Sequence, residues 1–111
     1  YPYPGGNVYG GTKAFVHQFS LNLRADLIGS RVRVTSVEPG MAETEFSVVR
    51  FKGDAGKAKD VYKGLQPMTP DNIAQTIEFI TTILPEHVNI NTIEMMPVMQ
   101  AFGAFAVKRN A

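Results

Sequence analysis

The sequence contains no cysteine and no tryptophan, and it has no apolar stretch long enough to cross a bilayer. Without cysteine there is no disulfide, no thiolate nucleophile and no cysteine-ligated metal ion. A membrane-spanning helix needs about 20 consecutive apolar residues. The opening residues, Tyr-Pro-Tyr-Pro-Gly-Gly, have neither the basic region nor the apolar core of a signal peptide. We therefore expect no membrane partner and a cytoplasmic location, with which the lack of cysteine agrees.

Charge of one sign is also scarce, because 11 basic residues are balanced by 10 acidic ones and the formal net charge is +1. Nucleic-acid-binding proteins concentrate Lys and Arg on one face. No such concentration occurs here, so we expect no nucleic-acid partner. The two histidines, His17 and His87, have no Glu or Cys at ligand spacing, and we expect no metal site. The 111 residues, 44% of them hydrophobic, suit one globular domain, and a single compact unit is the default expectation.

Two long helices can be predicted from apolar periodicity and from the residues that start and stop helices. Asn7 is a suitable N-cap for a helix that reaches about residue 28 and is closed by Gly29. A second helix begins with Thr69 as N-cap and Pro70 in the first helical position, and it stops before Pro85.

The β-branched segment Arg31–Val37 and the segment Val88–Met96 are predicted strands. Residues 41–66 have weak periodicity and three glycines, and we predict a mobile excursion with one short helix near 55–63. A strand, a long connection containing a helix and a second strand form a βαβ unit, in which the strands are parallel neighbours. Neither strand is a continuous apolar run, which favours a position near the edge of a larger sheet. The predicted fold class is α/β.

Tyr9 and Lys13 are spaced four residues apart in the first predicted helix, so their side chains share one face. When hydride reduces a carbonyl, the developing alkoxide needs a proton, which a phenol can donate. A nearby ammonium group and the helix N-terminus both favour the phenolate and so lower the pKa of a tyrosine. The pair therefore suits a proton shuttle. The alternative is a half-buried aromatic residue at the start of a helix, and the spacing also arises by chance.

The dipeptide Pro39-Gly40 follows the first predicted strand, and Thr44 lies four residues after the glycine. In parallel α/β sheets, ligands bind beyond the carboxyl ends of the strands. A tight turn there lets backbone amides approach a cofactor, and a nearby hydroxyl can hold a phosphate or a carboxamide. An ordinary strand-ending turn is the alternative. Among the basic residues of the following excursion, one such as Arg50 could bind an anionic substrate, although a solvated face is the simpler interpretation.

Taken in order, these segments resemble those of the short-chain dehydrogenases/reductases. The segment from Gly6 to Phe15, Gly-Asn-Val-Tyr-Gly-Gly-Thr-Lys-Ala-Phe, is similar to the active-site helix of that family. The segment from Val32 to Thr44, Val-Arg-Val-Thr-Ser-Val-Glu-Pro-Gly-Met-Ala-Glu-Thr, is similar to the next strand and its cofactor-contacting turn. The resemblance covers essentially the whole chain and implies the C-terminal portion of a Rossmann-like doubly wound parallel sheet.

A closer resemblance is to the NADP-dependent 3-hydroxy acid dehydrogenase subgroup, which acts on malonic semialdehyde, serine and allo-threonine. The segments that carry it are Thr44–Ser47, Val49–Asp54, Leu84-Pro85 and Val88–Val98. The resemblance implies an oxidoreductase that transfers hydride between NADP, or alternatively NAD, and a small hydroxy acid or its carbonyl product.

The resemblance also implies roles for individual residues. Tyr9 would be the general acid/base, and Lys13 would hold the nicotinamide ribose and lower the pKa of the tyrosine. The turn formed by Pro39, Gly40 and Met41 would border the nicotinamide, and Thr44 would reach its carboxamide or the pyrophosphate. The excursion at 41–66 would act as a substrate lid, in which we place three candidate residues: Glu45, Phe46 and Arg50.

The family's Gly-rich cofactor turn and its catalytic serine belong upstream of this sequence. We therefore expect residues 1–111 to be the C-terminal half of one dehydrogenase domain, inactive without the cofactor-binding half. The family resemblance implies a homo-oligomer, a dimer or a tetramer, in which the Tyr9 helix packs against its equivalent. Two other interpretations stay open, namely a non-catalytic nucleotide-binding or structural protein of the same fold, and an autonomous α/β interaction domain.

Overall fold

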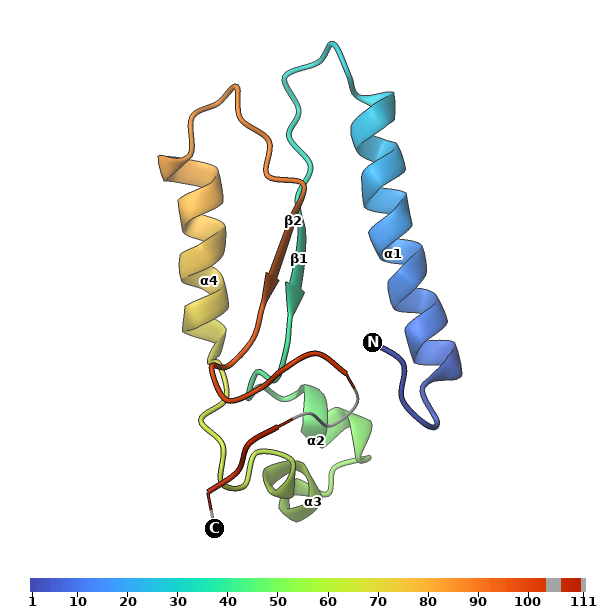
Figure 1. Cartoon of the computed structure of the whole chain (residues 1–111), viewed down its shortest axis with the longest axis vertical. Helices are drawn as coiled ribbons and strands as arrows, with labels where there is room; N and C mark the ends of the chain where they lie inside the picture. Colours follow the sequence, from blue (N-terminus) through green and yellow to red (C-terminus); the bar gives the residue numbers. More distant parts are fainter. Residues whose placement is uncertain (104–106, 111) are drawn as a thin grey trace.

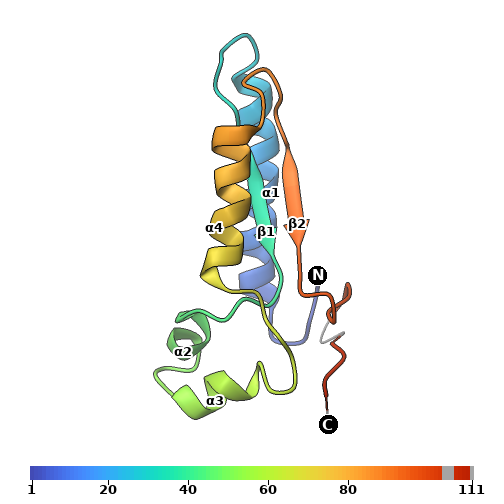
Figure 2. The same cartoon turned by 90° about the vertical axis from the view of Figure 1, so that its left-hand side faces the viewer.

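The computed structural model describes residues 1–103 and 107–110. The elements along the chain are α1 (Asn7–Asp26), β1 (Ser36–Pro39), α2 (Phe46–Arg50), α3 (Ala55–Asp60), α4 (Pro70–Glu78) with a π-helical continuation (Phe79–Ile83), and β2 (Thr92–Met95). Figure 1 shows the two strands side by side between α1 and α4. In Figure 2 the two helices lie in front of and behind the strands, so they cover opposite faces of the sheet. The predicted α/β class is confirmed.

The two strands are parallel neighbours, as predicted, and their register pairs Ser36 with Thr92 and Pro39 with Met95. The predicted strand bounds are wrong, because the paired strands occupy only Ser36–Pro39 and Thr92–Met95. Before the first paired residues of the two strands, the Asn89 side chain takes the place of a backbone partner for Val34. The Val34 amide donates to Asn89 Oδ1 at 2.8 Å, and Asn89 Nδ2 donates to the Val34 carbonyl at 2.9 Å.

Both long helices lie where the sequence predicts them, with small differences at their ends. In α1 the N-cap is Gly6, one residue before the predicted Asn7, and the helix ends at Asp26. Gly29 reverses the chain with φ of 91°, a conformation that glycine adopts readily. At the start of α4, Thr69 as N-cap and Asn72 in the first turn form a capping box, and Pro70 is the first helical residue.

The excursion at 41–66 contains two short helices, whereas the sequence analysis predicts one. Helix α3 ends at Asp60, earlier than predicted, and α2 is additional. A hydroxyl network fixes α2 against the rest of the excursion. Tyr62 donates to the Ala42 carbonyl at 2.9 Å, and the buried Ser47 hydroxyl, 2.7 Å from the Tyr62 oxygen, donates to it in turn.

The hydrophobic core of the described residues is small. The buried apolar side chains among them are Ala58, Met68 and Ile80, and α1 contributes none. The accessible surface is 8294 Å², whereas a compact monomer of 12.2 kDa exposes roughly 6,100 Å². The radius of gyration is 16.2 Å, against about 13 Å for a compact chain of this length. The default expectation of one compact unit is therefore not met by these residues alone.

Replacing Asn89 by alanine tests the side-chain extension of the sheet. We expect Asn89→Ala to lower the free energy of unfolding by about 1–3 kcal/mol, because both backbone polar groups of Val34 lose their partner. The measurement is urea denaturation of the intact protein that contains this chain. Asn22→Ala, which removes an amide from an exposed pair with Gln18, is the control and should change stability by less than about 0.5 kcal/mol. Equal effects of the two substitutions would contradict the assigned role of Asn89.

Candidate active site

An open cleft of about 1290 Å³ lies at the carboxyl ends of the two strands. Its walls come from the first turns of α1, the turn after β1, the excursion that contains α2, and the segment that follows β2. Figure 1 shows why these parts meet, because α1 begins at the same end of the sheet at which both strand arrows finish. Ligands of parallel α/β sheets bind at this end.

Tyr9 and Lys13 share one face of α1 and both line the cleft. Lys13 Nζ lies 5.5 Å from the centroid of the Tyr9 ring. Tyr9 is 41% exposed and lines the open cleft. Within the helix, the Thr12 hydroxyl donates to the Tyr9 carbonyl at 2.8 Å. The predicted spacing therefore places a phenol beside a cation at an open surface.

The Tyr9 ring also contacts residues from two other segments. The Phe46 ring on α2 lies 6.3 Å from it and the Tyr3 ring lies 6.4 Å from it, measured between centroids. The guanidinium carbon of Arg50 lies 5.6 Å from the Tyr9 centroid and 5.5 Å from the Tyr3 centroid. Arg50 Nη2 donates to the Tyr3 hydroxyl at 2.8 Å, which fixes the guanidinium beside Tyr9.

The turn after β1 is held by backbone and side-chain hydrogen bonds. The Gly40 amide donates to the Met95 carbonyl at 2.6 Å, which continues the β1–β2 pairing into the turn. The Met41 amide donates to Gln100 Oε1 at 2.9 Å. The Thr44 hydroxyl accepts from the Phe46 amide at 3.1 Å and so fixes the start of α2. The turn and α2 are thus tied together at the mouth of the cleft.

Most of the residues that the sequence analysis selects come together in this one cleft. Its lining includes Tyr9, Lys13, Pro39, Gly40, Met41, Thr44, Phe46 and Arg50. Glu45 does not line it and is exposed. Phe46 and Arg50 belong to α2 and lie beside the Tyr9 ring, and their role in a substrate lid stays a prediction.

Several polar residues of the cleft were not selected from the sequence. Glu38 and Glu94 are paired in the strand register and project from the same face of the sheet. His17 hydrogen-bonds to Glu38 across the gap between α1 and β1, and Tyr1 donates to Glu94 at 3.2 Å. Shielding of the hydroxyl from solvent, together with this hydrogen bond, raises the pKa of Tyr1. The parallel register could have revealed the two glutamates, but no sequence signal indicates Gln100.

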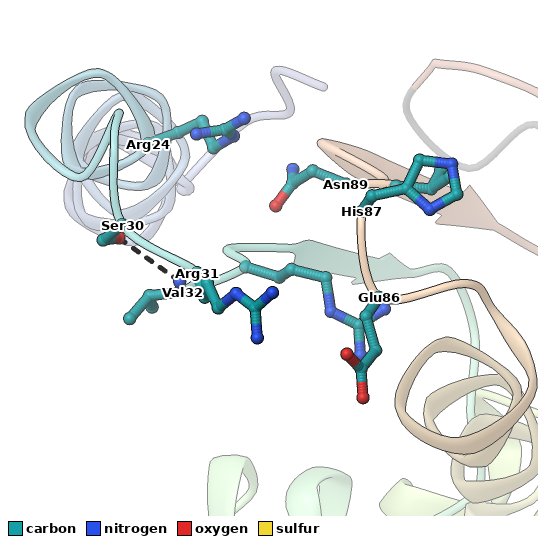
Figure 3. Close-up of a pocket in the computed structure, with 9 residues that line it drawn as sticks. Arg24, Ser30, Arg31, Val32, Glu86, His87 and Asn89 are labelled. Atoms are coloured by element: carbon teal, nitrogen blue, oxygen red, sulfur yellow. Dashed lines mark hydrogen bonds between the residues drawn. The ribbon is translucent and has the colours of Figure 1, made fainter.

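A second cavity of about 690 Å³ lies at the opposite end of the strands. Figure 3 shows Arg24, Arg31, Glu86, His87 and Asn89 around it, contributed by the end of α1 and the two loops that precede the strands.

Two further features are absent from the described residues. Among residues 1–103 and 107–110, no group of three His, Cys, Asp or Glu side chains is arranged to hold a metal ion. No helix in these ranges is long and apolar enough to span a membrane.

Comparison with known proteins gives matches along the whole chain. Residues 1–54 match the family model described as short chain dehydrogenase. A serine 3-dehydrogenase of Rhizobium radiobacter is 57% identical over 111 residues, which are 100% of this chain and 44% of that protein. The NADP-dependent 3-hydroxy acid dehydrogenase YdfG of Escherichia coli K12 is 57% identical over 110 residues, 98% of this chain and 44% of that protein.

A solved structure agrees with these sequence matches. The closed form of serine dehydrogenase complexed with NADP+ superposes with a TM-score of 0.89 at 57% identity, over 99% of this chain and 44% of the other. The chain thus spans 44% of the length of the first relatives and of this structure. The sequence-based resemblance is confirmed: the whole chain is similar to dehydrogenases of this kind, and residues 1–54 match the short chain dehydrogenase family model.

Proposed function

We propose that this chain is the C-terminal half of an NADP-dependent oxidoreductase that interconverts a small 3-hydroxy acid and its carbonyl product. The observation that carries the proposal is the position of Tyr9 and Lys13 in a cleft that they share with Pro39, Gly40 and Thr44. The substrate class follows from the relatives, two of which are named for serine and for 3-hydroxy acids. Malonic semialdehyde, serine and allo-threonine are the substrates to test.

Tyr9 is the proton-transfer residue in the proposed mechanism. During oxidation its phenolate accepts the proton of the substrate hydroxyl, and during reduction its phenol returns that proton to the developing alkoxide. NADP, when bound, accepts or supplies the hydride. Lys13, 5.5 Å from the ring centroid, stabilises the negative charge on the phenolate, and in the proposal it also holds the ribose hydroxyls.

The residues of the turn fit a nicotinamide nucleotide because they line the same cleft as Tyr9. In the proposal, Pro39, Gly40 and Met41 border the nicotinamide, and Thr44 offers a hydroxyl to its carboxamide or to the pyrophosphate. NAD is the alternative cofactor. The Gly-rich cofactor turn and the catalytic serine are proposed to lie in the other half of the intact protein, which agrees with the 44% share of its relatives that this chain covers.

Arg50 is the proposed contact for the substrate carboxylate. Its guanidinium lies over the Tyr9 ring and is oriented by the hydrogen bond to the Tyr3 hydroxyl. A carboxylate bound there would place a hydroxyl two carbons away close to Tyr9, as the geometry of a 3-hydroxy acid requires. The Phe46 ring, 6.3 Å from the Tyr9 ring between centroids, adds an apolar contact, and Glu45 has no contact role in this arrangement. Cytoplasmic location and assembly into a dimer or tetramer stay predictions.

Replacing Tyr9 by phenylalanine tests the proton-transfer role. In the intact protein we expect Tyr9→Phe to lower kcat/KM by about 10²–10⁴-fold, because the ring remains but the transferable proton is lost. The assay follows NADPH absorbance with malonic semialdehyde, serine and allo-threonine. Tyr1→Phe, which removes another hydroxyl from the same cleft, is the control and should keep most of the activity. Wild-type rates in Tyr9→Phe would disprove the role. Cofactor binding by wild-type protein without any turnover would favour the non-catalytic alternative.

Replacing Arg50 by methionine tests the carboxylate contact. We expect KM for a 3-hydroxy acid to rise about 10- to 100-fold, since a charge-assisted hydrogen bond contributes about 1.5–3 kcal/mol. KM for an uncharged alcohol of similar size should not change. Lys59→Met removes a cation from α3, away from Tyr9, and provides the matched control. If both substrates were affected equally by Arg50→Met, the residue would shape the cleft without binding the carboxylate.

The division of the site between two halves predicts that residues 1–111 alone are inactive. The purified chain should show no NADPH oxidation with malonic semialdehyde under conditions in which the intact protein turns over. The reason is that residues 1–111 offer the cofactor only the turn after β1, whereas the proposed phosphate-binding turn belongs to the other half of the domain. NADPH-dependent turnover by the isolated chain would contradict this expectation and support an autonomous domain.

A further inference from the structure

The segment after β2 returns across the carboxyl end of the sheet and reaches the turn that follows β1. In Figure 1 this segment crosses beneath both strand arrows toward α2. A turn in which the Gln100 amide donates to the Pro97 carbonyl at 2.9 Å orients the Gln100 side chain. Gln100 Oε1 then accepts from the Met41 amide at 2.9 Å, over a separation of 59 residues. Gln100 is therefore the direct link between this segment and the turn.

Gly40 is required for that contact. A Cβ atom at position 40 would lie 2.5 Å from Gln100 Oε1 and 2.7 Å from the Met96 Cβ, both closer than real Cβ contacts. The φ of Gly40 is not in the left-handed region, so backbone conformation does not demand a glycine here. What demands it is the Met96 Cβ, which is fixed to the backbone, whereas the Gln100 amide at the end of a flexible side chain would have to move aside and give up its contact with the turn. The glycine of the turn and Gln100 form one packed unit.

The same segment is also fastened to the far end of the excursion. Gln100 forms a bridge with Val107, and the Lys108 amide donates to the Met99 carbonyl at 2.8 Å. Arg109 Nη1 donates to the carbonyls of Val61 and Lys63, at 3.0 and 2.7 Å. With one end held by the excursion, the segment presents Gln100 to the turn from a fixed direction.

We propose that Gln100 is a positioning residue for the nicotinamide end of the cofactor, acting through the Met41 amide and the close contact at Gly40. This inference rests on the proposed function, in which the turn at Pro39, Gly40 and Met41 borders the nicotinamide. When the Met41 amide is hydrogen-bonded to Gln100, the turn is held in one orientation and presents a constant surface to the nicotinamide ring. Without the acceptor, the amide is left unpaired and the turn can rotate, which weakens binding of the nicotinamide and misplaces it relative to Tyr9.

The test compares two ligands in the intact protein. NADPH carries the nicotinamide, whereas adenosine 2′,5′-bisphosphate contains only the adenosine end of the cofactor. Dissociation constants are measured by fluorescence titration for NADPH and by competition for the bisphosphate. For Gln100→Leu we expect NADPH binding to weaken about five- to tenfold, with no change for the bisphosphate. Gln100→Glu keeps an acceptor oxygen and should restore NADPH binding to within about twofold of wild type.

Val98→Ala, at a side chain that is 97% exposed in the same segment, is the control and should leave both constants unchanged. Gln100→Ser provides the same comparison if the leucine variant does not fold. Equal weakening of both ligands would show a merely structural role and overturn the inference, as would unchanged NADPH binding. Failure of the wild-type protein to bind NADPH at all would instead overturn the proposed function.

Discussion

The pairing of β1 with β2 is the interaction on which the rest of this structure depends. The four-residue ladder aligns the two strands so that both end at the same level, and the Asn89 side chain lengthens it at the other end. Beyond that level the pairing continues into the turn, where the Gly40 amide donates to the Met95 carbonyl. Two walls of the cleft begin from this edge, because the turn follows one strand and the segment that carries Gln100 follows the other. A slip of the register would separate Gly40 from Gln100 and disperse the site.

Helix α1 depends much less on the sheet within the described residues. It has no buried residue, and Phe15 and Phe19 on it are 68% and 54% exposed. The surface in excess of a compact monomer is about 2,200 Å², slightly more than the roughly 1,200–2,000 Å² that a standard protein interface buries. The contacts of the helix on this side include the hydrogen bond of His17 with Glu38 on β1 and the contacts of Tyr9 with Arg50 and Phe46 on α2. The position of Tyr9 relative to the turn is therefore set by few contacts, and it is sensitive to whatever covers the apolar face of α1 in the intact protein.

The sequence predicts best the features that arise from local rules. The i and i+4 spacing of Tyr9 and Lys13, the capping signal at Thr69 and the chain reversal at Gly29 each depend on a few neighbouring residues, and all three are found. The strand bounds are wrong because Asn89, 55 residues from Val34, supplies the partner that a backbone would otherwise supply. Helix α2 is not predicted because its five residues are too few to show a periodic pattern. It is held in place by the hydrogen bond between the Ser47 and Tyr62 hydroxyls, which are 15 residues apart in the sequence.

The glycine of the turn shows how one residue can have another physical reason than the one that the sequence suggests. From the sequence, Gly40 is expected to let a cofactor approach the backbone. In the structure the atoms that would meet a Cβ there belong to Gln100 and Met96. Both residues lie more than 50 positions after Gly40 in the sequence. The absence of a side chain at position 40 therefore serves an internal contact first. Because that contact pairs the Met41 amide, the shape of the turn is decided by the segment after β2, and that segment is itself anchored to the excursion by Arg109. Any movement of the excursion is thus transmitted to the surface on which the nicotinamide is proposed to rest, which makes the far end of the chain part of the site.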